Sequence, residues 1–207
     1  YITLAPVSTL VGLAFKLYDP DHLIGEQSDY GITCALIPSK TKGLQIGPRH
    51  LPLGIPFMNG TILGTDIFVP LDYIIGGTEQ AGKGWRMLVE CLSAGRAISL
   101  PSGAMGGAKA SACATGAYAR VREQFNVPIA EFEGIAEPLG RIAGYTYIIT
   151  ASVNTTAMAI GAGEKPAVIS AIMKYHTTEM ARKISIDAMD IHGGKAVMRG
   201  PKNYMAS

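Results

Sequence analysis

Charged side chains are scarce in this sequence. Asp, Glu, Lys and Arg make up 16% of the 207 residues, and hydrophobic residues make up 48%. Because a soluble domain usually carries about 25% charged residues, part of the apolar surface is expected to be buried against other chain segments or subunits. The net charge of +2 includes no basic run and no alternation of basic and aromatic residues, which argues against nucleic acid as a partner.

Cysteine is also rare, and its placement excludes a disulfide framework. Cys34, Cys91 and Cys113 are odd in number, lie far apart and form no C-x-x-C pair, so we expect reduced thiols in a cytoplasmic protein. The four histidines form no H-E-x-x-H motif, so no metal site is expected. His176 lies on an apolar helical stripe and is interpreted as a core histidine with satisfied hydrogen bonds.

Complete motifs for phosphate binding and serine chemistry are missing. Residues 77–84, GTEQAGKG, nearly match the loop G-x-x-x-x-G-K-[ST], but Gly84 stands where a hydroxyl would hold magnesium. A flexible loop at the start of a helix is the preferred interpretation. No G-x-G-x-x-G follows a strand pattern and no G-x-S-x-G is present, so a Rossmann site and a serine-hydrolase elbow have no support.

Residues 142–163 carry no charge and are numerous enough to span a bilayer. They include many hydroxyl and amide side chains, which suit a lipid-facing helix poorly, so no transmembrane segment is expected. A helix buried in a bundle or a subunit interface is the preferred interpretation. The small residues of 102–117, SGAMGGAKASACATGA, likewise predict close packing of helices or subunits.

The residue pattern changes near Gly77. Before it, short β-rich runs predict strands, and the pairs Asp19-Pro20, Lys42-Gly43 and Asn59-Gly60 predict turns. The runs are YITLAPVST, VGLAFKLYD, GITCALIPS, GLQIGPRH and TDIFVPLDYII. The class is therefore α+β, with a partial β domain over residues 1–77 and a partial helical domain over residues 78–207.

After Gly77 the period is helical. Three long helices are predicted: residues 84–124 with a bend at Pro101, residues 131–162, and a third from Pro166 to Gly193-Gly194. At 100° per residue, Arg96 shares the face of Trp85, Leu88 and Leu92, so it is expected on a buried face that offers no local carboxylate.

Five segments occur in an order that resembles the acyl-CoA dehydrogenase family. They are ITCALIPSKTKGLQIG, DIFVPLDYIIGG, GWRMLVECLSAGR, REQF and AMDIHGG. The resemblance spans nearly the whole chain and is closest to the long bacterial enzymes of fatty-acid β-oxidation. It implies a truncated middle β-barrel or sandwich domain followed by part of a C-terminal up-and-down helical bundle, and hence a core fragment of a longer enzyme.

The resemblance also implies a chemistry. In this family a glutamate removes the α proton of a fatty acyl-CoA, the β hydrogen passes as hydride to FAD, and an electron-transfer flavoprotein takes the electrons. The product is a trans-2-enoyl-CoA. The implied protein is a homodimer or larger homo-oligomer, located in the cytoplasm or at the periphery of the inner membrane.

Tyr1 and Thr3 match the family's aromatic-I-T strand, in which the aromatic ring packs on the flavin and the threonine approaches its N5 atom. Arg122, Gln124 and Phe125 match the R-x-T-F segment that reaches the FAD of a neighbouring subunit, with Gln124 in place of threonine.

Asp190, Gly193 and Gly194 match the Q-x-x-G-G turn near the FAD pyrophosphate. Asp190 replaces a glutamine and brings a negative charge toward the phosphates.

Arg96 matches an arginine beside the catalytic glutamate of relatives, which would supply its missing partner. Some relatives carry the base just before this arginine, where this chain has Gly95. The base is therefore expected in an E-G motif beyond Ser207, and the chain as given is expected not to turn over acyl-CoA. Two alternatives stay open: an acyl-CoA oxidase of the same superfamily, and a non-catalytic oligomeric scaffold.

Overall fold

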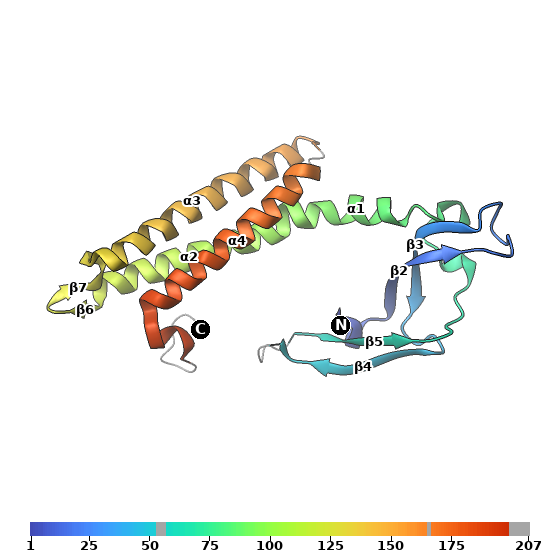
Figure 1. The fold of residues 1–207 in the computed structure, drawn as a ribbon, viewed down its shortest axis with the longest axis horizontal. Coiled ribbons are helices and arrows are strands. Elements are labelled where there is room, and N and C mark those ends of the chain that lie inside the picture. Colours follow the sequence, from blue (N-terminus) through green and yellow to red (C-terminus); the bar gives the residue numbers. More distant parts are fainter. Residues whose placement is uncertain (53–56, 165–166, 199–207) are drawn as a thin grey trace. The chain divides into compact units, whose positions relative to one another are not determined.

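The computed structural model describes residues 1–52, 57–164 and 167–198, which form two compact units (Figure 1). The first unit is Tyr1–Cys91 and the second is Leu92–Ser207. Strands and short loops make up most of the first unit, and long helices make up most of the second. The α+β class and the helical bundle predicted from the sequence are confirmed. The described strands form separate small sheets and do not close into a barrel.

Two antiparallel sheets build the first unit (Figure 1). Strand β2 (Leu10–Tyr18) pairs with β3 (Asp29–Pro38). The second sheet has the order β1-β5-β4, in which β5 (Asn59–Gly64) lies between β1 (Ile2–Thr3) and β4 (Leu44–His50). The turns predicted at Asp19-Pro20 and Lys42-Gly43 follow β2 and precede β4, respectively.

Two sequence predictions about this unit were wrong. Asn59-Gly60 begins β5 instead of forming a turn. A side chain at Gly60 would lie 2.8 Å from the Cγ atom of Pro6, so the glycine allows Pro6 to pack closely against β5. Residues 65–75 do not form a strand, apart from one bridge between Ile74 and Ala35. Pro70 has no N–H to donate to a neighbouring strand, and the segment turns through a 3₁₀ helix at Leu71–Tyr73.

The helical run begins with α1 (Gly84–Ala94) and continues, after a π-helical turn at Gly95–Ser99, as α2 (Leu100–Val121). The predicted interruption is thus real, but it precedes Pro101, which occupies the first turn of α2, where a missing N–H is tolerated.

The other helices are α3 (Glu133–Gly161) and α4 (Ala167–His192). The predicted start at Pro166 lies outside the described residues. The predicted stop at Gly193-Gly194 is confirmed, since α4 ends at His192 and Gly193 has a φ of 59°.

Helices α2, α3 and α4 pack side by side as a bundle (Figure 1). On α3, Ile142, Ile149 and Val153 are buried at a helical spacing, so the uncharged segment faces the core along one stripe. Its hydroxyls bond to backbone carbonyls; Thr150 donates to Thr146 at 2.8 Å, for example. No helix in the described parts of the chain is both long and apolar enough to cross a membrane.

An ion pair joins α3 to α4. The Nε and Nη2 atoms of Arg141 each donate to a different carboxylate oxygen of Asp187, both at 2.8 Å. The hydrogen bond with Asp187 raises the pKa of the Arg141 guanidinium, so the arginine stays charged. This forked geometry fixes the two helices in register more specifically than a single contact would.

Candidate cofactor-binding site

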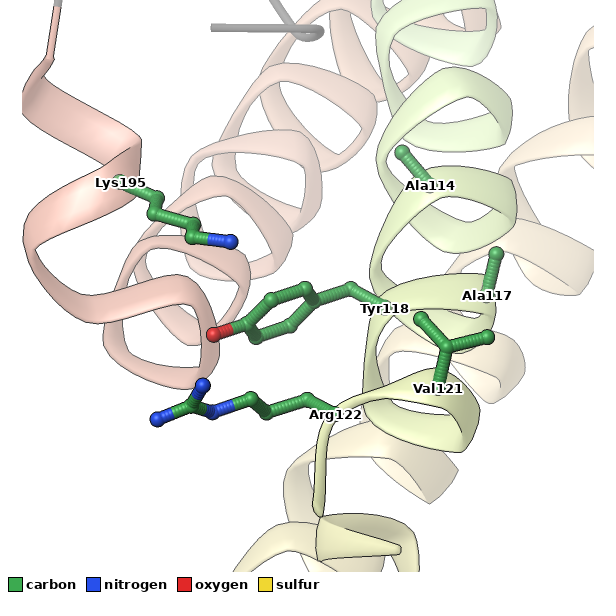
Figure 2. Close-up of a pocket in the computed structure, with 6 residues that line it drawn as sticks. All are labelled: Ala114, Ala117, Tyr118, Val121, Arg122 and Lys195. Atoms are coloured by element: carbon green, nitrogen blue, oxygen red, sulfur yellow. The ribbon is translucent and has the colours of Figure 1, made fainter. Parts of the chain in front are cut away.

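A pocket of about 450 Å³ lies at one end of the helical unit (Figure 2). Ala114, Ala117, Tyr118 and Val121 line it from α2, and their spacing of three and four residues puts them on one helix face. Arg122 and Lys195 complete the lining. The pocket therefore combines small apolar residues, an aromatic ring and two cations, and none of the described residues that line it is acidic.

The ring of Tyr118 is the centre of this arrangement. In Figure 2 it lies between the side chains of Lys195 and Arg122. The Lys195 ammonium is 5.3 Å from the ring centroid, within range of a cation–π interaction. The imidazole of His192 stacks on the same ring, with centroids 4.5 Å apart.

His192 anchors the end of α4 to α2. Only 5% of its surface is exposed, and its Nε2 atom lies 3.2 Å from the hydroxyl oxygen of Thr115, which is also buried. Burial, together with the nearby charge of Lys195, lowers the pKa of His192, so the ring is neutral at neutral pH. The core histidine is thus His192, whereas His176, to which the sequence analysis gave that role, is exposed.

The motifs in the sequence did not predict Tyr118 and Lys195 as site residues. The available signal was the position of Lys195 directly after Gly193-Gly194, because the positive φ of Gly193 turns the chain into the 3₁₀ helix Gly193–Val197. Asp190, by contrast, is exposed on the last turn of α4 and does not line the pocket.

The predicted segment Arg122–Phe125 follows α2 directly. Gln124 is exposed in β6 (Glu123–Gln124), which pairs with β7 (Val127–Pro128). Phe125 and Asn126 form the two-residue turn between them, with φ values of 54° and 64°, as a type I′ hairpin requires. Such a backbone is rare for phenylalanine, and the Phe125 side chain is 88% exposed. Arg122 thus faces the pocket, and Phe125 projects from a hairpin tip.

Tyr1 and Thr3 lie at the start of the first unit. Thr3 pairs with Asn59 across the β1–β5 ladder. The exposed ring of Tyr1 meets His50 edge-on, with centroids 5.1 Å apart. Beside them, His50 Nε2 and Asn59 Oδ1 are buried atoms without a hydrogen-bond partner among the described residues. Buried polar atoms usually have a hydrogen-bond partner.

Arg96 lies in the π-helical turn Gly95–Ser99 and is exposed. The prediction that it shares a buried face was wrong, because Trp85 and Leu92 are exposed as well and the π turn changes the helical period on which that prediction relied. Arg96 forms no hydrogen bond or ion pair with any residue that the structure describes. Turns of this kind often occur at functional sites.

The loop of residues 77–84 is fixed on β3 by close packing. The N–H of Gly82 donates to the Thr33 hydroxyl at 2.9 Å, and a side chain at Gly84 would lie 2.8 Å from the carbonyl oxygen of Ile32. Gly82 and Gly84 therefore allow close contact with β3, and the loop leads into α1 as predicted. In the described ranges, no group of three or more His, Cys, Asp or Glu residues could hold a metal ion.

A two-unit α+β chain whose helical bundle ends in a basic, aromatic pocket fits a protein that binds an anionic cofactor with a flat ring. The family model "Acyl-CoA dehydrogenase, C-terminal domain" matches residues 82–206. Since this match covers more than half of the sequence, the chain belongs to the acyl-CoA dehydrogenase family, as its motifs predicted.

Two curated proteins illustrate how much of the chain its relatives match. The protein HemX of Proteus mirabilis is 62% identical over 104 residues, which is 50% of this chain and 61% of that protein. The 3-(aryl)acrylate reductase of Clostridium sporogenes is 30% identical over 203 residues, covering 98% of this chain and 51% of the reductase. The chain thus spans about half the length of the curated relatives it matches.

A solved structure shows the same fold. The acyl-CoA dehydrogenase of Geobacillus kaustophilus superimposes with a TM-score of 0.82 at 23% identity, over 99% of this chain and 51% of that one.

Proposed function

We propose that this chain is part of an FAD-dependent acyl-CoA dehydrogenase that converts fatty acyl-CoA to trans-2-enoyl-CoA in β-oxidation and passes electrons to an electron-transfer flavoprotein. The observation that carries the proposal is the pocket formed by Tyr118, Arg122 and Lys195 beside the Gly193-Gly194 turn. It lies within the residues that match the family model.

The residues present fit FAD. Two cations, with no acidic residue among the described residues of the lining, suit a diphosphate, and Tyr118 with the two alanines offers a flat apolar surface. In the first unit, the exposed ring of Tyr1 suits contact with a flavin ring, and Thr3 offers a hydroxyl two residues away. When bound, FAD would accept the hydride from the β carbon of the substrate.

The role proposed for Arg96 is to position the general base. An exposed guanidinium without a partner in the described chain is free to face a carboxylate, and its charge favours the ionised form that removes the α proton. Gly95, just before it, has no side chain. Glu90 is held by the Nε atom of Arg86 at 2.8 Å, so neither residue supplies the base. We assign that role to a glutamate outside this sequence.

The free thiols Cys34, Cys91 and Cys113 support a reducing compartment, for which we propose the cytoplasm. The exposed apolar residues of α3 and α4 support self-association into a homodimer or larger homo-oligomer.

The test is a flavin spectrum of the purified full-length protein, followed by anaerobic addition of saturated acyl-CoA. Bound flavin that loses its visible absorbance with acyl-CoA, but not with free CoA, is the expected result. A protein that takes up no FAD would instead support the non-catalytic scaffold.

Oxygen consumption during turnover would identify an acyl-CoA oxidase.

One relative is named a 3-(aryl)acrylate reductase. Reoxidation of the reduced flavin by an arylacrylate therefore tests whether the protein reduces a double bond instead of forming one.

A further inference from the structure

We infer that Lys195 is a cofactor-positioning residue that binds the diphosphate of FAD together with Arg122, and that it replaces Asp190 as the polar contact from the Gly193-Gly194 turn. The inference rests on the proposed function and adds to it a residue that the family motif does not include.

The first argument is geometric. Lys195 approaches the pocket from the segment after α4, and Arg122 approaches it from the end of α2. Figure 2 shows the two side chains on either side of the Tyr118 ring. The contact with this ring, 5.3 Å from the ammonium to the centroid, directs a long and flexible lysine side chain toward the pocket.

The second argument is electrostatic. Neither Lys195 nor Arg122 forms an ion pair with a residue in the described part of the chain. Two positive charges facing one pocket repel each other, and an anion bound between them removes this repulsion. A diphosphate carries enough negative charge and enough acceptor oxygens for both groups.

The third argument concerns Asp190. Its carboxylate is exposed on α4 and is absent from the pocket lining, so it does not oppose the phosphates directly. A carboxylate cannot donate a hydrogen bond to phosphate when ionised, whereas the ammonium of Lys195 donates up to three. Lys195 therefore offers, directly after the Gly193-Gly194 turn, a hydrogen-bond donor for phosphate that Asp190 before the turn does not.

The anchor of Lys195 is His192. Because His192 is buried against Thr115 and stacked on Tyr118, the turn that follows it has a defined position relative to α2. Burial, and after it the charge of Lys195, lowers the pKa of His192, so the neutral ring adds no charge of its own to the pocket.

The experiment measures the affinity of the apo-protein for FAD and for ADP by titration, at several salt concentrations. The variants are Lys195→Met, Lys195→Arg and Arg122→Met, and the charge-matched control is Lys174→Met, which changes an exposed lysine on α4. We expect Lys195→Met to weaken the binding of both ligands about tenfold and to make log Kd less dependent on log salt. The affinities of Lys195→Arg for both ligands should stay close to those of the wild type, and those of Lys174→Met should equal them.

If Lys195→Met bound FAD as tightly as the wild type, the inference would be overturned while the proposed function stood. A loss of affinity with an unchanged salt dependence would also overturn the inference, because it would indicate a structural effect. Thermal melting identifies a variant that does not fold. If Lys195→Met does not fold, Lys195→Arg is the test, because a tenfold loss of FAD affinity in this folded variant would show that the positive charge at residue 195 does not bind the diphosphate. If the wild-type protein binds no FAD, the proposed function fails and the inference fails with it.

Discussion

The imidazole of His192 lies nearly parallel to the ring of Tyr118, with 21° between their planes, and so joins the last turn of α4 to α2. The same histidine contacts Thr115, which is fully buried. This contact places the Gly193-Gly194 turn beside the pocket, so the packing of one core residue determines the position of the residues that follow it.

The stability of the protein should fall as the pH decreases below about 6.5 because of His192. Its pKa is lowered in the folded state, and that of the unfolded chain is about 6.5, so the unfolded state binds the proton first. The stabilisation is therefore complete above about pH 6.5 and is lost as the pH falls toward the lower folded value. The midpoints of urea unfolding of the wild type and of His192→Gln, at several pH values, measure the contribution of His192 to this pH dependence.

His176→Gln is the control for this experiment, because His176 is an exposed histidine on the same helix. If His192→Gln retained the full wild-type slope below about pH 6.5, the loss would have to come from another group.

The forked pair of Arg141 and Asp187 should stabilise the α3–α4 contact. Asp187→Asn removes one charge and weakens both hydrogen bonds, so we expect a lower melting temperature. Glu179→Gln changes the exposed Arg182–Glu179 pair within one helix and should lower it much less. Equal melting temperatures for the two variants would show that the pair between helices adds nothing.

Two glycine substitutions should have opposite effects. Gly84→Ala places a methyl group within 3.0 Å of the β3 backbone at three atoms and should destabilise the protein by about 1–3 kcal/mol. Gly144→Ala lies inside α3 with open space around the new side chain, and should stabilise it by about 0.5–1 kcal/mol. Denaturant unfolding measures both, and a tolerated Gly84→Ala would contradict the close packing described for this loop.

Arg96→Ala should affect turnover far more than folding. The side chain is exposed, so the stability should change by no more than about 0.5 kcal/mol. Turnover of the full-length enzyme should fall at least about tenfold, because a neighbouring charge shifts a carboxyl pKa by about 1–3 units. Electron-acceptor reduction with a saturated acyl-CoA is the assay, with Arg182→Ala as the control. A loss of stability that matches the loss of activity would assign Arg96 a structural role.

Self-association should cover the outer apolar side chains of α3. Tyr147 and Met158 are 76% and 75% exposed, on a segment without charge, and exposed apolar surface of this extent usually marks an interface. Light scattering should show at least a dimer, and Met158→Lys should shift it toward the monomer. A stable monomer with bound FAD would contradict this prediction.

The sequence by itself determined the local structure wherever a periodic pattern and its end signals agree. The β-rich run in residues 31–39 lies largely within β3, and the glycine pair after His192 ends α4. The order of the motifs also determined the family, since each short segment has its own spacing.

Tertiary structure alone decided which surfaces are covered and which partners meet. A helical period predicts which residues share a face, but it cannot show whether another element packs on that face, so Arg96 and His176 are exposed although their stripes suggested burial. The π turn at Gly95–Ser99 shifts the period itself. Tyr118 and Lys195, which are distant in sequence, meet only because α4 packs against α2, and a contact of that kind depends on the whole bundle rather than on any local signal.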